Sequence, residues 1–145
     1  MPDDWRAAAA DYSQMGFSLA RFFQRDEEIL RDRPVRKASF LPIDSEVALD
    51  NAFALGSTET VLLFLHDPFC PISSSAYEQM ERVEATVHVI DVSSHSGLGR
   101  GIQTRTGIRH ESPQAIVLRH GEPAWHASHG RIRTESVTQA LAEDE

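Results

Sequence analysis

The chain has a single cysteine, Cys70, so it cannot form an internal disulfide, and any disulfide of this residue must join it to another molecule. It has no uninterrupted apolar run long enough to span a bilayer, and its first residues lack the basic and then apolar pattern of a secretory signal peptide. Basic residues are few, since 14 lysines and arginines stand against 22 acidic residues, which argues against a nucleic-acid partner. These absences predict a cytoplasmic protein that binds neither a membrane nor nucleic acid.

A chain of 145 residues is long enough for one domain with a substantial core and too short for two ordinary ones. In residues 3–31, apolar side chains recur every three or four positions, which predicts an amphipathic helix. Pro34 prevents this helix from continuing, so residues 1–37 are expected to form a helical extension and linker, and residues 38–145 the domain. The helix is expected to dock on its own domain or on a partner chain, in the second case as a homodimer.

From residue 38 onwards, apolar runs of strand length alternate with segments of helical pattern. Five strands are predicted, at residues 39–43, 61–65, 87–92, 114–118 and 124–128, with a hairpin turn at 120–123. Helices are predicted at residues 46–55, at 73–80, in a weak segment that ends at Gly107, and at 134–142 with Thr134 as its N-cap. This order predicts an α/β fold with a thioredoxin-like mixed sheet flanked by helices.

Cys70 lies where the second predicted strand passes into a helix, in the sequence Cys70-Pro71-Ile72-Ser73. Proline suits the first helical position, and a thiol at a helix N-terminus faces unpaired backbone N–H groups that favour the thiolate. We therefore predict a reactive cysteine with a lowered pKa, the other interpretation being a buried, inert one. Thioredoxin-like redox proteins hold their nucleophile in this arrangement, but Ser73 replaces the second cysteine of C-x-x-C. The chemistry is thus expected to be monothiol.

Ser73 has two interpretations. Its hydroxyl could donate a hydrogen bond to the Cys70 thiolate, or it could only satisfy backbone groups of the first helical turn. In neither case can it close a disulfide, so a mixed disulfide on Cys70 would persist until an outside thiol attacks it.

Ser112 and Pro113 directly precede the fourth predicted strand. A trans proline here would merely end the preceding loop, as most X-Pro bonds are trans. In a thioredoxin-like sheet, however, this position faces the cysteine turn, and a cis proline would expose the backbone of Ser112 to pair with an extended substrate. Ser112 and Pro113 are therefore candidate substrate-binding residues.

Four histidines occur late in the chain, namely His110, His120, His126 and His129. A metal site needs several converging ligands, but His126 and His129 would point to opposite faces of a strand, and no cysteine or carboxylate lies at ligand spacing. No metal site is therefore predicted. His126 is expected in packing or at the surface, whereas His129, near the strand end, could line a groove.

The motif CPIS at residues 70–73 and the segment GIRHESPQAIVLRHGEPAWHASH at residues 107–129 together resemble the YtxJ-like proteins, the monothiol bacilliredoxins of the bacillithiol system. The resemblance implies a thioredoxin-like fold, a cytoplasmic setting, and exchange chemistry on proteins that hold bacillithiol, the thiol co-substrate, in mixed disulfide. By position, it implies that Cys70 is the redox nucleophile, with Ser73, Ser112 and Pro113 around it. His110 and Glu111 belong to the same motif and are candidate substrate-binding residues.

Three hypotheses follow for the function. The first is a monothiol oxidoreductase that takes bacillithiol from modified proteins onto Cys70. A low-molecular-weight thiol or a partner redoxin then releases the bacillithiol from Cys70. The second is a thioredoxin-like module whose groove at Cys70 and Pro113 binds a partner segment without turnover. The third, an iron–sulfur carrier of the glutaredoxin type, is least favoured because those carriers have glycine where Pro71 stands.

Overall fold

The computed structural model describes residues 37–143, so the predicted N-terminal helix lies outside the described part of the chain. The strands are β1 (Ser39–Pro42), β2 (Val61–His66), β3 (Thr86–Asp91), β4 (Gln114–Arg119) and β5 (Glu122–Ser128). The helices are α3 (Glu46–Gly56), α4 (Pro71–Glu81), α5 (Ser96–Thr106), the short 3-10 turn η1 (His129–Arg131) and α6 (Thr134–Ala142). The order of strands and α-helices in this part is the predicted one, and η1 is an additional element.

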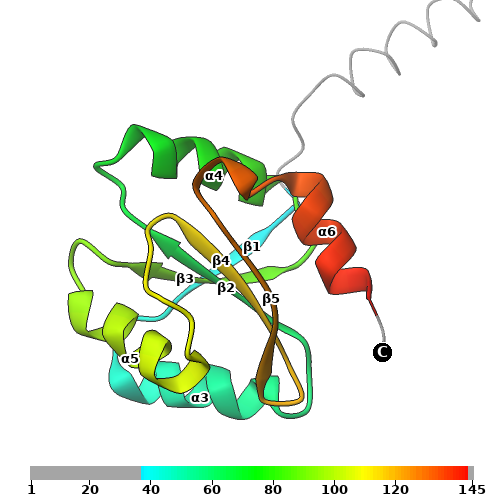
Figure 1. Cartoon of the computed structure of the whole chain (residues 1–145). Coiled ribbons are helices and arrows are strands. Elements are labelled where there is room, and N and C mark those ends of the chain that lie inside the picture. Colours follow the sequence, from blue (N-terminus) through cyan, green and yellow to red (C-terminus); the bar gives the residue numbers. More distant parts are fainter. Residues whose placement is uncertain (1–36, 144–145) are drawn as a thin grey trace, which may run out of the picture. The chain divides into compact units, whose positions relative to one another are not determined.

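The five strands form one sheet in the order β1-β3-β2-β4-β5 (Figure 1). β1, β3 and β2 are parallel, whereas β4 runs antiparallel to β2 and β5 antiparallel to β4. β2 is the central strand, and its register pairs Leu65 with Gln114. The end of β2, from which the chain reaches Cys70, therefore lies beside the start of β4, which Ser112 and Pro113 precede.

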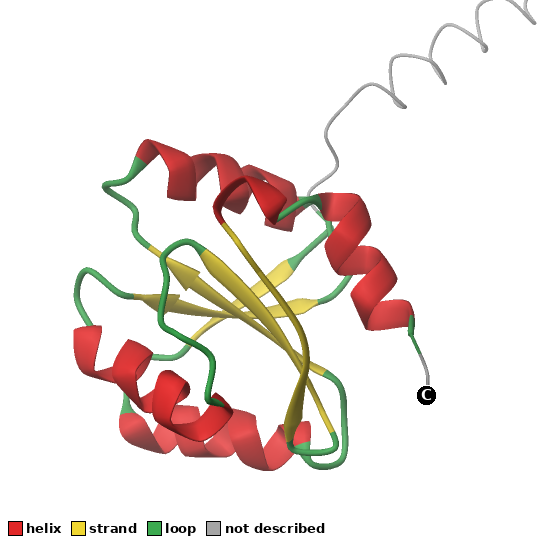
Figure 2. Ribbon diagram, viewed as in Figure 1, coloured by secondary structure: helices red, strands yellow, loops and turns green. Residues whose placement is uncertain are grey.

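Helices cover both faces of this sheet (Figure 2). Side chains of β2 alternate between the two faces, so that Phe64 packs with α4 and α6 while Leu63 packs with α3 and α5. The predicted mixed sheet with helices on both faces is confirmed. No helix within residues 37–143 combines the length and the apolar character needed to cross a membrane.

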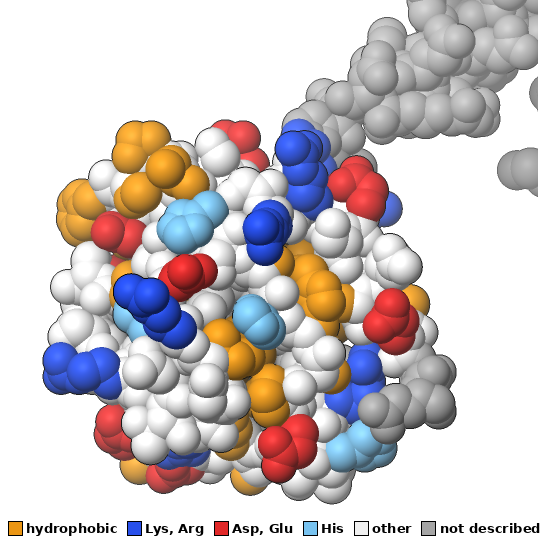
Figure 3. All heavy atoms as spheres, in the orientation of Figure 1, with side chains coloured by type: hydrophobic (Ala, Val, Ile, Leu, Met, Phe, Trp, Pro, Cys, Tyr) orange, Lys and Arg blue, Asp and Glu red, His pale blue; other side chains and the backbone are white. Residues whose placement is uncertain are grey.

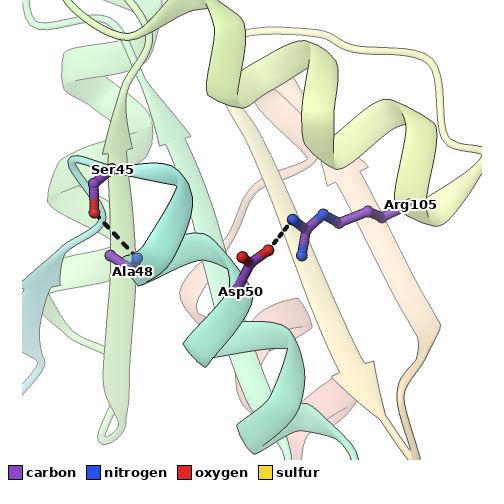
Figure 4. Close-up of polar contacts among 4 residues, drawn as sticks. All are labelled: Ser45, Ala48, Asp50 and Arg105. Carbon is purple, nitrogen blue, oxygen red and sulfur yellow. Dashed lines mark hydrogen bonds and ion pairs between the residues drawn. The ribbon is translucent and has the colours of Figure 1, made fainter.

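Polar contacts cap α3 and join it to α5 (Figure 4). The Ser45 hydroxyl caps α3 by accepting the backbone N–H of Ala48 at 3.1 Å. The Arg105 guanidinium of α5 forms an ion pair with Asp50 of α3 and lies 5.0 Å from the centre of the Phe53 ring. α5, the weak helix of the sequence, ends at Gly107, whose φ of 73° is the left-handed conformation that glycine favours.

The last hairpin is tighter than predicted. Its turn consists of His120 and Gly121, both with positive φ, and β5 already begins at Glu122 rather than at residue 124. β5 tolerates Pro123 because it is an edge strand, where proline is commonly found. The register between β4 and β5 also shifts between Val117 and Leu118, next to the proline.

The predicted N-cap of the last helix is wrong by one residue. Arg133 is the N-cap, and the side chain of Thr134 turns instead towards the neighbouring helix α4. Its hydroxyl donates to the Gln79 carbonyl oxygen at 2.8 Å, and its backbone N–H donates to Gln79 Oε1 at 3.0 Å. Thr134 thus fastens α6 to α4, a tertiary contact that the local sequence pattern does not reveal.

Candidate active site

A tight turn joins β2 to α4 and positions the cysteine. The backbone N–H of Cys70 donates to the Asp67 carbonyl oxygen at 3.1 Å, and the N–H of Phe69 donates to Asp67 Oδ1 at 2.9 Å. Both bonds close the turn on Asp67, so the position of Cys70 is set directly by the end of the central strand.

Cys70 is the N-cap residue of α4, in an extended conformation, and Pro71 occupies the first turn of the helix. This confirms the predicted place of the cysteine at a helix N-terminus. Its side chain makes no capping hydrogen bond, and the residue is partly exposed. The residue is thus not shut inside the core, and N–H groups at the start of a helix favour negative charge.

The side chain of Ser73 is directed into the protein. It is fully buried, and its Oγ accepts the backbone N–H of Asp67 at 2.9 Å and lies 2.7 Å from Nδ1 of His66. Its hydroxyl therefore holds the end of β2 against the start of α4. Of the two interpretations of Ser73, the structure favours the one without a bond to Cys70, because its hydroxyl contacts the His66 ring and the Asp67 backbone instead.

His66 completes this buried contact, although no pattern in the sequence singled it out. Its ring stacks against Phe64 and Tyr77, with centroids 5.4 and 4.9 Å away. Burial lowers the pKa of His66, while the charges of Asp91 and Asp67 act in the opposite direction. Burial thus favours the neutral imidazole, whose Nδ1 shares a hydrogen bond with the Ser73 hydroxyl.

Acid is expected to destabilise the fold through two half-buried histidines. Burial lowers the pKa of both His66 and His88 in the folded protein, so the unfolded chain binds protons first as the pH falls below about 6.5. The free energy of unfolding should therefore fall between pH 7.5 and 5.5, as measured by urea denaturation. The variant His120→Asn, altered at an exposed histidine, should keep this pH dependence. A flat profile for the wild type would contradict the assignment of neutral, buried imidazoles.

The bond between Ser112 and Pro113 is cis. Pro113 is buried, and its carbonyl oxygen accepts the N–H of His129 at 3.1 Å. The Ser112 Oγ is buried and has no hydrogen-bond partner among the described residues. The two residues thus lie at the end of the sheet where the cysteine turn begins. Among the described residues, the Ser112 hydroxyl there has no hydrogen-bond partner.

Gln114 holds the loop that contains these residues. It is almost fully buried, and its Nε2 donates to the Arg109 carbonyl oxygen at 3.1 Å while its Oε1 accepts the Glu111 N–H at 3.4 Å. The amide therefore spans the loop from residue 109 to the start of β4, which gives Ser112 and Pro113 a fixed position.

His110 contacts α5. Its N–H donates to Gln103 Oε1 at 2.7 Å, and its ring lies so close to Gly99 that a Cβ there would be 2.6 Å from Cε1. Residue 99 is therefore a glycine because the His110 ring leaves no space for a Cβ atom there. His110 makes a packing contact here, and its role in substrate binding stays a prediction.

Gly99→Ala is expected to lower the free energy of unfolding by about 1–3 kcal/mol, because the new methyl group must displace the His110 ring. Helix propensity alone would predict a gain of up to about 1 kcal/mol. Gly97→Ala is the matched control, since only Arg100 Nη2, at 3.9 Å, lies near its Cβ position. Denaturant unfolding of both variants and of the rescue Gly99→Ala/His110→Ala tests this. A Gly99→Ala protein as stable as Gly97→Ala would contradict the contact.

Glu111 lies in a pocket of about 450 Å³ that is also lined by His126, Ser128, His129 and Arg131. A hydrogen bond from Ser128 and the nearby positive charges of His129, Arg109 and His126 lower the pKa of the Glu111 carboxyl. The predicted separation of His126 and His129 onto opposite faces is wrong. β5 ends at Ser128, and His129 has a φ of 54° that starts η1, so both histidines line one pocket.

Large apolar side chains flank the cysteine. Phe69 is 85% exposed and Ile72 is 54% exposed, on the two sides of Cys70 in the sequence. Figure 3 shows hydrophobic side chains gathered at the end of the molecule where α4 starts. No group of three histidine, cysteine or carboxylate side chains that could hold a metal ion occurs within residues 37–143.

Comparison with known proteins shows the family of the chain. Residues 41–137 match the family model described as monothiol bacilliredoxin BrxC. Among solved structures, a protein assigned as an oxidoreductase with a thioredoxin fold is 28% identical, with a TM-score of 0.64 over 70% of this chain and 92% of that one.

Two thioredoxins share the fold at lower identity. A mutant thioredoxin from Halobacterium salinarum is 18% identical, with a TM-score of 0.54 over 71% of this chain and 88% of that one. Thioredoxin from Trypanosoma brucei brucei is 14% identical, with a TM-score of 0.55 over 73% and 90% of the two chains. Fold, cysteine position and family match together support a thiol redox role, and the chain belongs to the monothiol bacilliredoxin family.

Proposed function

We propose that the protein is a monothiol thiol-disulfide oxidoreductase that removes bacillithiol from protein mixed disulfides through Cys70. Its substrates are then proteins that carry bacillithiol, and bacillithiol is the thiol co-substrate. The family match supports the class of chemistry, and a cytoplasmic location, where thiols are kept reduced, belongs to the same proposal.

The observation that supports this proposal most is the position of Cys70. It is the only cysteine of the chain, it is partly exposed, and it caps the N-terminus of α4. A thiolate at this position can attack a disulfide sulfur, and a helix N-terminus stabilises the negative charge that the attack requires.

In the first step, the Cys70 thiolate attacks the bacillithiol sulfur of the modified protein. The new bond joins Cys70 Sγ to that sulfur, the old disulfide breaks, and the protein leaves as its thiolate. One disulfide replaces another, so no external oxidant or reductant is consumed.

In the second step, an outside thiolate attacks the mixed disulfide and Cys70 leaves as thiolate. Ser73 cannot supply this thiolate, because it is a serine whose hydroxyl is buried against His66 and Asp67. A second low-molecular-weight thiol or a partner redoxin must therefore close the cycle.

The proposal is tested by the intact mass of the reduced protein after incubation with bacillithiol disulfide and, in parallel, with glutathione disulfide. We expect a single adduct per chain, formed faster with bacillithiol. If neither disulfide modifies the protein at neutral pH, the proposal fails, and the exposed Phe69 and Ile72 would favour a module that binds a partner without turnover.

A further inference from the structure

Two pockets lie on the two sides of the turn η1. The Glu111 pocket, described above, is lined by Glu111, His126, Ser128, His129, Gly130 and Arg131. The second, here called the Ile72 pocket, has a volume of about 270 Å³, and Ile72, Ser75, Gln79, His129, Gly130 and Arg133 are among its lining residues. His129 and Gly130 line both pockets, so the two pockets adjoin at η1 and are together called the recess along η1.

The Ile72 pocket of this recess lies beside the start of α4. Ile72 and Ser75 belong to the first turns of α4, the helix that Cys70 caps. On the other side, the N–H of His129 is bonded to the carbonyl oxygen of Pro113, which ties η1 to the cis-proline loop. A small molecule joined to Cys70 through a disulfide would therefore lie next to the recess.

The lining of the recess has the opposite charge to the protein as a whole. The chain has a formal net charge of −8, yet every charged or titratable residue from 126 to 133 is a histidine or an arginine. Figure 3 shows histidine and basic side chains together on the face over β5. Arg131 lines the Glu111 pocket and Arg133 the Ile72 pocket, so each pocket has one permanent positive charge.

Among the described residues, Glu111 is the one carboxylate that lines either pocket. The pKa of its carboxyl is lowered by the Ser128 hydrogen bond and by the charges of His129, Arg109 and His126. The groups around Glu111 therefore stabilise a carboxylate in this recess. A carboxylate of a bound ligand would meet the same groups.

We propose that the recess along η1 binds the carboxylate groups of the low-molecular-weight thiol that Cys70 exchanges, with Arg131 and Arg133 as the principal charges. This inference rests on the proposed function and adds the class of ligand that the site selects, a thiol with free carboxylates. The volume of the two pockets is that of a small-molecule site, which favours such a thiol over an acidic segment of a protein partner.

Three small disulfides that differ in charge test this inference. Dithiodipropionate is anionic, hydroxyethyl disulfide is neutral and cystamine is cationic. The rate of Cys70 modification by each is measured by mass spectrometry. It is divided by the rate of thioglycerol, a neutral thiol that is not the parent thiol of any of the three, with the same disulfide, which removes intrinsic differences in reactivity. The readout is the ratio of the normalised anionic rate to the normalised neutral rate.

For the full-length wild type, this ratio should exceed one despite the negative net charge of the protein, and cystamine should be slowest. In Arg131→Gln/Arg133→Gln the ratio should fall about tenfold at low ionic strength, and this difference should shrink at about 0.5 M salt. Glu111→Gln should raise the ratio, because it removes the competing carboxylate. Circular dichroism and thermal unfolding verify that each variant is folded.

The matched control is Lys37→Gln/Arg82→Gln, which removes two exposed positive charges near the far end of α4. This control should keep the wild-type ratio. The inference is overturned if the control lowers the ratio as much as the arginine pair, if the arginine pair leaves it unchanged, or if Glu111→Gln lowers it. If none of the three disulfides modifies Cys70, the proposed function itself fails.

Discussion

Cys70→Ser is expected to abolish every covalent adduct with disulfides and all release of thiol from bacillithiolated proteins, because it removes the only sulfur nucleophile of the chain. The fold should be kept. Cys70 makes no capping hydrogen bond, and serine is a preferred N-cap residue, so the free energy of unfolding should be unchanged or about 0.5–1 kcal/mol higher.

This variant also separates catalysis from binding. Adduct formation is followed by intact mass, and non-covalent binding of an unmodified substrate protein by calorimetry. If the protein is an enzyme, the variant forms no adduct at all. If it is a binding module that does not need the sulfur, the variant keeps its affinity for the substrate protein, and the wild type releases no thiol. Any residual thiol release by Cys70→Ser would contradict the role of Cys70.

Ser73→Ala is expected to lower the free energy of unfolding by about 1–3 kcal/mol. The change removes the acceptor of the Asp67 N–H and the hydrogen-bond partner of His66 Nδ1, and no water can easily replace a hydroxyl in a fully buried position. Because Asp67 also closes the turn that holds Cys70, the rate of adduct formation should fall as well. Urea denaturation and time-resolved mass spectrometry measure the two effects.

Ser74→Ala is the matched control in the same helical turn. The Ser74 hydroxyl is exposed and donates to the Cys70 carbonyl oxygen at 3.2 Å, so its loss should change stability by no more than about 0.5 kcal/mol. Equal effects of the two alanine variants would show that the buried contact of Ser73 has no special role.

The order of strands and helices could be predicted because it depends on local patterns. A few consecutive residues are enough to indicate the buried run of β2, the helical spacing in α3 and the end of α5 at Gly107. The place of Cys70 follows from the same kind of signal, a cysteine and a proline directly after a buried strand. The predicted N-terminal helix, and a homodimer through it, stay predictions because residues 3–31 lie outside the described part.

The rest of the site depends on contacts between segments and could not be predicted in this way. His66 and Ser73 are seven residues apart, and their hydrogen bond exists only because the turn folds α4 back over the end of β2. Likewise, strand periodicity predicted that His126 and His129 point to opposite faces of the sheet. Nothing in the local sequence indicates that β5 ends between them. The cis bond before Pro113 is equally invisible in the sequence, which allowed both isomers.

The central claim is that Cys70 accepts bacillithiol from a modified protein as a monothiol. The most direct measurement is the number of substrate thiols released per chain when the reduced protein is mixed with an excess of a bacillithiolated protein and no other thiol is present. We expect release that stops at one equivalent, matched by one bacillithiol adduct on Cys70, and that resumes when free bacillithiol is added. Absence of release, or release without an adduct on Cys70, would contradict it.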